Sequence, residues 1–356
     1  MSEKIARNLW PLVPVVMSIV ATTILLVLVG GDPALTFSAL LDGAIGSSDR
    51  LFSTLAFWVP LLLCASGLLV TFTAGLWNIG VEGQMIMGAL GASWVALKVA
   101  APYPAIPGWL VLLMEMLVAM AFGALWSALA GILKTRGGVH EIFGGVALNN
   151  LAIIATNYLI SGPWQPPEGG TFRGTQPFPG RALFPLLGDT RFSPLSLGIA
   201  VVVLLVVALS LRGTSWGLRL KALGRNPRSA FLLGVPSERE TLTAMLVCGA
   251  TAGLAGSVRV LSWFDSLRQS ISGGIGFLAI LIVLLAGMRP LWTLLIALFF
   301  SALLTGGTIV QLRTQLKASI SGIIQGTLVL FVLLFGDYRL LLRRRRSEAE
   351  VEETES

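Results

Sequence analysis

The chain has 356 residues, of which 55% are hydrophobic and 12% are charged, and its mean hydropathy is +0.83. Soluble domains carry about 25% charged residues, so this composition excludes an ordinary soluble enzyme, a disordered protein and a nucleic-acid-binding protein. Apolar stretches of about 20 residues, which are long enough to cross a bilayer, recur along the chain. The sequence therefore predicts an all-α polytopic membrane protein.

About ten transmembrane helices are predicted from the apolar segments. The eighth segment is short and opens on glycines, so we expect a broken, tilted or re-entrant element there. In chain order the predicted spans are Pro11–Gly30, Leu51–Thr73, Val81–Ala100, Trp109–Leu133, Ile142–Ile160, Pro194–Leu211, Leu242–Leu261, Gly274–Gly287, Leu291–Val310 and Ile320–Phe335.

Basic residues predict the orientation of these spans. The chain carries 25 lysines and arginines against 18 acidic residues, a net charge of +7. With both termini in the cytoplasm, most of the basic residues fall in cytoplasmic segments, as the positive-inside rule requires. We predict a transmembrane domain over residues 1–338, with an extracytoplasmic loop at 161–193 and a cytoplasmic loop at 212–240. Residues 339–356 are a basic, then acidic cytoplasmic tail that we expect to be disordered.

The segment Thr73–Gln84 joins two predicted spans and contains glycines and polar residues but no lysine or arginine. This composition predicts non-helical backbone at membrane depth, which survives only where it is buried in protein or lines a watery cavity. Glu82 is then either a functional ionisable group near the membrane or a cap near the N-terminus of the helix that follows. The residues alone leave both interpretations open.

Two further polar segments interrupt the apolar pattern. Glu141 opens a predicted helix, where a carboxylate suits the helix dipole, and Asn149 lies inside an apolar run, where we expect it to face the bundle. Gly274 and Phe277 belong to the glycine-rich entry into the short eighth span, which predicts irregular backbone near a pathway. His140 is the single histidine, and without a Cys/His cluster beside it a boundary residue is favoured over a metal ligand.

The cytoplasmic loop 212–240 contains a short predicted helix. Asn226 and Pro227 form a helix start, residues 227–233 an amphipathic turn, and Gly234 a helix end. A loop that only fixes membrane orientation would need the positive charge but not this order of start, helix and stop. We therefore favour a helix that docks on a cytoplasmic partner.

Other features narrow the class of protein. No G-x-x-x-x-G-K-[ST] occurs, so the chain does not bind ATP through a P-loop. Few carboxylates lie inside the spans, which disfavours an ion-coupled secondary transporter without excluding it. Cys64 and Cys248 lie in apolar runs and are expected to be core residues. Small residues four apart, at 123/127/131, 249/253 and 322/326, predict close helix packing.

Three segments resemble the permeases of ABC importers that serve ribose-type sugars, branched-chain amino acids and nucleosides. Gly75–Gln84, which reads G-L-W-N-I-G-V-E-G-Q, is similar to the signature of these permeases, and its N-I-G-V-E-G-Q form is most similar to the nucleoside branch. Glu141–Asn149 resembles a family segment in which a Glu opens a helix that ends in Leu-Asn. Ala222–Val235 resembles the cytoplasmic coupling region. The resemblance covers about Leu51–Phe335.

This resemblance implies a permease subunit, not an enzyme, that forms half of a translocation pore for a small polar solute, preferably a nucleoside. The alternatives are a ribose-type sugar permease or a self-contained secondary transporter. No cofactor is expected on this chain, because a partner ATPase would use MgATP. The other implied partners are a second, paralogous permease and an extracytoplasmic substrate-binding protein. The implied location is a bacterial-type cytoplasmic membrane, with both termini cytoplasmic.

The residues implied to carry these roles fall into two groups, and neither group includes a catalytic or metal-binding residue. The first group lines or gates the translocation pathway, and the second couples the permease to the ATPase. The pathway group is Trp77, Asn78, Glu82, Gln84, Glu141, Asn149, Gly274 and Phe277, and the coupling group is Arg225, Asn226, Pro227, Arg228, Ala230 and Gly234.

Overall fold

The computed structural model describes residues 13–167, 174–314, 322–323, 326–327 and 330. Within these residues the regular structure is helical, apart from one isolated antiparallel β-bridge between Gly174 and Arg268. The all-α prediction is therefore confirmed. The chain divides into two compact units, one of residues 52–301 and one of residues 1–51 together with 302–356. The predicted tail, 339–356, lies outside the described residues.

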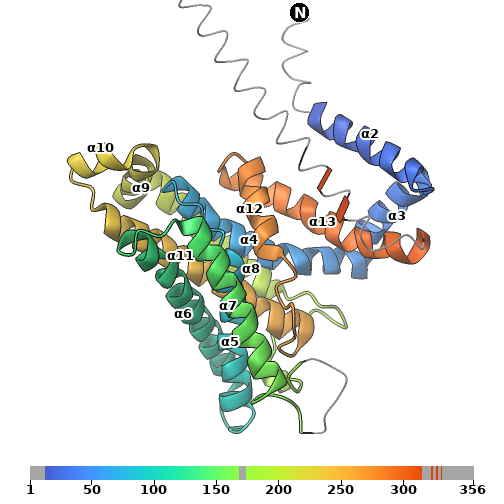
Figure 1. Cartoon of the computed structure of the whole chain (residues 1–356). Helices are drawn as coiled ribbons and strands as arrows, with labels where there is room; N and C mark the ends of the chain where they lie inside the picture. Colours follow the sequence, from blue (N-terminus) through green and yellow to red (C-terminus); the bar gives the residue numbers. More distant parts are fainter. Residues whose placement is uncertain (1–12, 168–173, 315–321, 324–325, 328–329, 331–356) are drawn as a thin grey trace, which may run out of the picture. The chain divides into compact units, whose positions relative to one another are not determined.

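The unit of residues 52–301 holds most of the helices (Figure 1). Two π-helical segments, η2 and η4, continue α5 and α11 without a break, and η3 is a single 3₁₀ turn. In chain order the helices that lie in or enter this unit are α4 (Ser48–Thr73), α5 (Val81–Val95), η2 (Ala96–Ala100), α6 (Gly108–Thr135), α7 (Glu141–Ser161), η3 (Gly180–Ala182), α8 (Pro194–Gly213), α9 (Ser215–Arg225), α10 (Pro227–Leu232), α11 (Ser237–Val258), η4 (Arg259–Phe264), α12 (Ile275–Leu285) and α13 (Pro290–Thr314).

The other unit contains α2 (Val13–Leu28), α3 (Pro33–Ile45) and the outer parts of α4 and α13. The chain bends by 120° between α2 and α3. Asp42 on α3 forms ion pairs with Arg50, at 2.7 Å, and with Arg313 near the end of α13. These pairs join α3 to the start of α4 and to the end of α13.

Among the described residues, six helices are long and apolar enough to cross a membrane, and a seventh crossing is added if the bent pair of α2 and α3 is one span. The six are α4, α6, α7, α8, α11 with η4, and α13, and each matches a predicted segment. The third predicted span is helical over α5 and η2 but is not among the six, and the eighth is α12, which has 11 residues. The tenth, Ile320–Phe335, lies largely outside the described residues. The prediction of about ten transmembrane helices is therefore not confirmed.

Helices α5, α6 and α11 pack side by side (Figure 1). They approach closely because glycines lie where they cross. A Cβ on Gly253 would lie 2.1 Å from the carbonyl oxygen of Ala119, one on Gly88 would lie 2.2 Å from the Cα of Gly253, and one on Gly249 would lie 2.3 Å from the carbonyl oxygen of Gly123. The close packing predicted from the spacing of small residues is confirmed at 123/127/131 and 249/253, whereas a Cβ on Gly322 or Gly326 would have nothing within 4 Å among the described residues.

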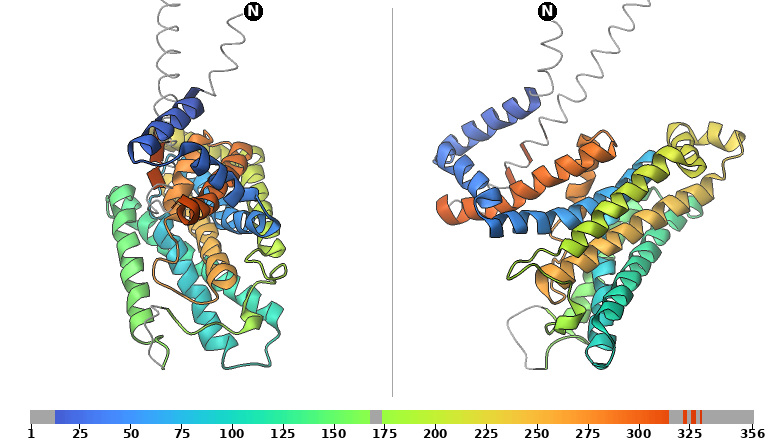
Figure 2. Two further views of the ribbon diagram at one scale, coloured as in Figure 1. Left: turned by 90° about the vertical axis from the view of Figure 1, so that its right-hand side faces the viewer. Right: turned by 180° about the vertical axis from the view of Figure 1, so that it is seen from behind.

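The two ends of α11 meet different structures (Figure 2). At its start, beside the end of α6, Arg136 and Glu238 form an ion pair of 2.9 Å, and α9 and α10 lie at this end. At its other end the irregular segment 174–192 covers η4, where the N–H of Phe184 donates to the carbonyl of Leu261 at 3.1 Å. The unit thus presents two short helices at one end and irregular backbone at the other.

Candidate functional site

A buried amide pair lies at the non-helical turn between α4 and α5. Asn78 Nδ2 donates to Gln84 Oε1 at 3.1 Å, Gln84 Nε2 donates to Asn78 Oδ1 at 2.9 Å, and both residues are 1% exposed. Asn78 Nδ2 also lies 3.1 Å from the sulfur of Cys248 on α11. At 1.5 Å per residue, Cys248 is about 16 Å along α11. The turn is therefore buried inside the bundle, as expected of irregular backbone, while its depth in a membrane stays a prediction.

Asn149 on α7 fixes the start of α5. Its Oδ1 accepts the N–H of Gly83 at 2.7 Å, and its Nδ2 donates to the carbonyl of Ile79 at 3.0 Å. One turn earlier on α7, Gly145 lets the two backbones touch, since a Cβ there would lie 2.7 Å from the nitrogen of Gly80. One amide thus satisfies backbone groups that the entry into a helix leaves unpaired.

Glu82, in the first turn of α5, caps a different helix. Its Oε1 accepts the N–H of Gly274 at 3.1 Å and its Oε2 accepts the N–H of Gly276 at 2.7 Å, at the N-terminus of α12. Gly274 has a φ of +81°, and Glu82 itself is 4% exposed. The carboxylate therefore compensates the positive end of the α12 dipole. Neither interpretation from the sequence included this contact with α12.

Glu141 ties the same turn to the end of α6. Its Oε1 accepts the N–H of Trp77 at 3.3 Å, and its Oε2 pairs with Lys134 Nζ at 2.5 Å. His140 caps α7 through Nδ1, and the described residues include no group of His, Cys, Asp and Glu that could hold a metal ion. Seven of the eight predicted pathway residues therefore meet around residues 77–84. Phe277 does not bond to them and is 46% exposed on α12.

Helix α10 forms where the sequence predicts it. Asn226 caps it by accepting the N–H of Ser229 at 3.1 Å, Pro227 is its first residue, and Gly234 follows its end with a φ of +81°. Ala230 is buried against the rest of the chain. The remaining predicted coupling residues, Arg225 and Arg228, are exposed.

The tip of α10 exposes large apolar side chains. Phe231, Leu232 and Leu233 are 69%, 84% and 81% exposed. Isolated exposed apolar residues are ordinary, but three in succession form a continuous apolar patch, of the kind that another protein or a membrane covers. This apolar tip, Phe231–Leu233, was not among the residues predicted from the sequence, although the letters F-L-L inside a polar loop could have indicated it.

Helix α9 was not predicted from the sequence. Thr214 caps its start, and Arg219 pairs with the buried Glu240 of α11 at 2.6 Å. Gly224, near its end, fits against the last turn of α4, since a Cβ there would lie 2.2 Å from the carbonyl oxygen of Thr73. A capping Thr followed by apolar residues at helical spacing was the available signal. Helix α9 therefore connects α10 to α4 and α11.

Besides Glu240, two buried charged residues were not among the predicted site residues. Arg259 in η4 is 6% exposed and has no ion pair within the described part of the chain. Glu115 on α6 is fully buried, and neither of its carboxylate oxygens has a hydrogen-bond partner among the described residues. A charged residue inside an apolar run is the signal that could have found both.

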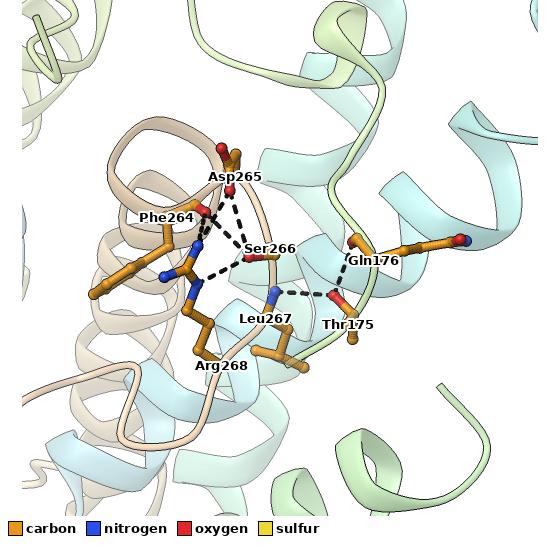
Figure 3. Close-up of polar contacts among 7 residues, drawn as sticks. All are labelled: Thr175, Gln176, Phe264, Asp265, Ser266, Leu267 and Arg268. Atoms are coloured by element: carbon orange, nitrogen blue, oxygen red, sulfur yellow. Dashed lines mark hydrogen bonds and ion pairs between the residues drawn. The ribbon is translucent and has the colours of Figure 1, made fainter. Parts of the chain in front are cut away.

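The turn that follows η4 is held by the segment after Gly174 (Figure 3). Thr175 and Leu267 exchange hydrogen bonds, of 2.9 Å from the Thr175 N–H and 3.1 Å to the Thr175 hydroxyl. Arg268 pairs with Asp265 at 3.6 Å, and Asp265 has a left-handed φ of +55°. These contacts fix the place where the chain reverses from η4 toward α12.

The helices are thus interrupted inside one bundle, at residues 74–80 and again between η4 and α12. Irregular backbone in such a position belongs to membrane proteins that move solutes, because it exposes backbone hydrogen-bonding groups where a helix would hide them. The fold and these polar breaks define a helical membrane transport protein.

Residues 50–333 match the family described as "Branched-chain amino acid transport system / permease component". The chain belongs to this permease family. It is the permease subunit of an ABC transporter, a multi-pass membrane protein and a transport component rather than an enzyme, as its resemblance implied.

Several relatives match over most of their length. The nucleoside ABC transporter permease protein NupB of Lactococcus lactis is 30% identical over 86% of this chain and 85% of its own. The guanosine permease NupP of Bacillus subtilis is 29% identical over 93% and 94%, and a second guanosine permease of that organism, NupQ, is 29% identical over 70% and 78%. The glucose permease TsgB13 of Haloferax volcanii is 30% identical over 97% and 93%.

Proposed function

We propose that this chain is the permease subunit of an ATP-driven importer and forms half of the pathway for a nucleoside. One observation carries the importer assignment: the apolar tip of α10 is exposed on a permease that has no P-loop of its own. Such a tip suits docking on a separate ATPase that hydrolyses MgATP. Arg225, Asn226, Pro227, Arg228, Ala230 and Gly234 build or flank this surface.

The chemistry of the buried polar groups supports an uncharged polar solute. The amides of Asn78, Gln84 and Asn149 are uncharged and bond to one another or to the backbone of the turn, so this helix break brings no unpaired charge to the pathway. The N-terminus of a half-helix inside a bundle attracts anionic groups, but at α12 the Glu82 carboxylate already occupies this position. A nucleoside meets these requirements, and NupB and NupP carry nucleoside and guanosine in their names.

The assembly that we propose contains two permeases. NupP and NupQ, two guanosine permeases of one organism, are both similar to this chain, which favours a paralogous heterodimer over a homodimer. The other subunits are cytoplasmic ATPases and an extracytoplasmic substrate-binding protein that delivers the solute.

The orientation that we propose places α9 and α10 in the cytoplasm of a bacterial-type cell, with both termini on the same side. The basic residues near this end of the bundle support it through the positive-inside rule. They are Lys134, Arg136, Arg212, Arg219, Lys221, Arg225, Arg228 and Arg239.

In this proposal, the conformational change is transmitted from α10 to the turn at residues 74–80. Docking of the ATPase moves α10 with α9, to which it is joined, and Gly224 of α9 presses directly on Thr73 and Gly75. The turn that follows carries Asn78 and leads to Glu82, whose carboxylate holds α12. ATP binding favours one position of α9 over the other. This preference shifts the pathway between its two conformational states.

Reconstitution of the purified complex tests this proposal. The permease, its co-purifying subunits and the binding protein are placed in proteoliposomes, and uptake of radiolabelled guanosine and glucose is measured with MgATP, with and without vanadate. We expect uptake of guanosine that vanadate inhibits and that unlabelled glucose does not reduce. Uptake that follows an ion gradient and survives vanadate would instead indicate a self-contained secondary transporter.

A sugar is the second candidate solute, because TsgB13, a glucose permease, is as similar to this chain as NupB is. Uptake of glucose without guanosine in the same proteoliposomes would select it and reject the nucleoside.

A further inference from the structure

Arg259 occupies an unusual environment at the end of α11. Its guanidinium Cζ lies 4.6 Å from the ring centroid of Phe57, 4.7 Å from that of Phe264 and 5.1 Å from that of Trp263. Its Nε donates to the carbonyl of Ile271 at 3.2 Å. Three aromatic rings and one carbonyl therefore surround a positive charge that has no acidic partner within the described residues.

The guanidinium is not fully satisfied by these contacts. Its Nη1 is buried and has no hydrogen-bond acceptor among the residues that the structure describes. Cation–π contacts recover only part of what burial of a charge costs, and buried donors normally find an acceptor. An acceptor that the described residues do not supply would complete the site, and a bound ligand can provide it.

The surroundings of Arg259 can admit such a group. The rings of Phe57, Trp263 and Phe264 are each only half-buried, and Arg259 belongs to a π-helical segment, a feature frequent at functional sites. The segment in front of it, residues 270–274, includes three residues with left-handed φ and is exposed at Ser270 and Gly273. Displacement of this segment, whose Ile271 carbonyl accepts from Arg259 Nε, would expose more of the guanidinium.

The donor set selects the chemistry of the ligand. Arginine offers donors only, in one plane, and matches a pair of in-plane acceptors such as O6 and N7 of a 6-oxopurine. Aromatic rings beside it can stack on the flat face of the base. A sugar hydroxyl also donates a hydrogen bond, and among the described residues no carboxylate forms an ion pair with Arg259 that would accept it.

We propose that Arg259 and the three rings form a subsite for the 6-oxopurine base of the transported solute. The proposal rests on the proposed function and adds the part of the solute that this chain reads. In the proposed orientation the subsite lies toward the extracytoplasmic end, where residues 174–192 cover η4 and the binding protein delivers its solute.

The substitution Arg259→Gln tests the subsite, because glutamine pairs with the amino group and N7 of adenine rather than with the acceptors of a 6-oxopurine. Uptake of inosine and of adenosine is measured for the wild-type and the variant complex with the same binding protein. The preference of the binding protein affects both complexes equally, so it cancels when their inosine-to-adenosine uptake ratios are compared. A bidentate contact discriminates bases by roughly 5- to 150-fold. We expect the inosine-to-adenosine ratio to fall by a factor in this range.

The matched control is Arg268→Gln, the same change on the next arginine of this segment, which also lies over the Phe264 ring; its ratio should stay at the wild-type value. If Arg259→Gln fails to assemble, Arg259→Lys replaces it and should lower the ratio less, since lysine keeps the charge but loses the planar fork. An inosine-to-adenosine ratio that stays at the wild-type value in Arg259→Gln, whether or not uptake of both nucleosides falls, would overturn the proposed subsite. Absence of wild-type nucleoside uptake would reject the proposed function itself and the subsite with it.

Discussion

The two ends of α11 each bury a charge, and they compensate it in opposite ways. At the end beside α9, Glu240 is 2% exposed and pairs with Arg219 at 2.6 Å. At the other end, Arg259 is 6% exposed and meets rings and a carbonyl but no carboxylate among the described residues. An ion pair joins α9 to α11 and serves the architecture. Burial of a guanidinium whose donor has no acceptor among the described residues destabilises the fold. A ligand that accepts a hydrogen bond from this donor would compensate the loss.

Glu82 lies between these cases, because its charge is compensated by the N-terminus of α12 rather than by a cation. The first prediction addresses this residue and has the largest expected effect. Glu82→Gln replaces one acceptor by an NH₂ group that faces an N–H, and an unsatisfied buried donor costs about 1–3 kcal/mol. We expect solute uptake to fall roughly 10- to 100-fold while the ATPase and second permease still co-purify.

Glu238→Gln, an identical change at an exposed position of α11, is the control and should transport normally. Complete loss of assembly in Glu82→Gln would mean that the carboxylate only supports the fold and has no separate part in gating.

Arg219→Met at the paired end should lower stability rather than transport selectivity. It leaves Glu240 buried without its cation, for which we expect a loss of about 2 kcal/mol, below the 3–5 kcal/mol of a fully buried pair because Arg219 reaches water. Apparent melting temperature in detergent measures the loss. The double variant Arg219→Met/Glu240→Met should recover most of it. A double variant as unstable as the single one would break the comparison between the two ends of α11.

Gly224→Ala tests whether α9 transmits motion to the turn at residues 74–80. The added methyl group would lie 2.2 Å from the carbonyl oxygen of Thr73, and overpacking of this kind costs about 1–3 kcal/mol. We expect about a tenfold fall in solute moved per ATP hydrolysed, with ATP hydrolysis preserved. Gly213→Ala, where nothing lies within 4 Å of the new atom, is the control. If solute moved per ATP hydrolysed is unchanged in Gly224→Ala, Gly224 takes no part in transmitting motion from α9 to the turn.

Arg136→Met should have the smallest effect. Its ion pair with Glu238 joins α6 to α11 on the surface, with the two side chains 71% and 52% exposed. Such exposed pairs contribute about 0–1 kcal/mol, so melting temperature and uptake should both stay near wild type. A drop as large as that of Arg219→Met would show that burial does not distinguish the two pairs.

Local patterns predicted several parts of the structure well. The start at Asn226 and the stop at Gly234 define α10 because capping depends on neighbours along the chain. The spacing of Gly249 and Gly253 predicted close packing because a helix repeats its faces every few residues. Apolar length found all six long spans. The same reasoning overlooked α9, whose polar residues and basic charges made it look like loop.

Contacts between distant residues could not be predicted in this way. The partner of Glu82 lies 192 positions away in the chain, at the N-terminus of α12, whereas the cap considered from the sequence was on the helix that directly follows Glu82. Arg259 is surrounded by rings from α4 as well as from its own turn, and nothing near it in the sequence reveals that an acid is absent.

The sequence by itself determined that this is a helical membrane protein, where its long helices run, and that it resembles ABC permeases, because hydropathy, capping and motifs are local properties. Only the tertiary structure decided which buried charges are compensated and by what. Compensation requires two groups to meet at about 3 Å, and the packing of α4, α5, α11 and α12 brings those groups together.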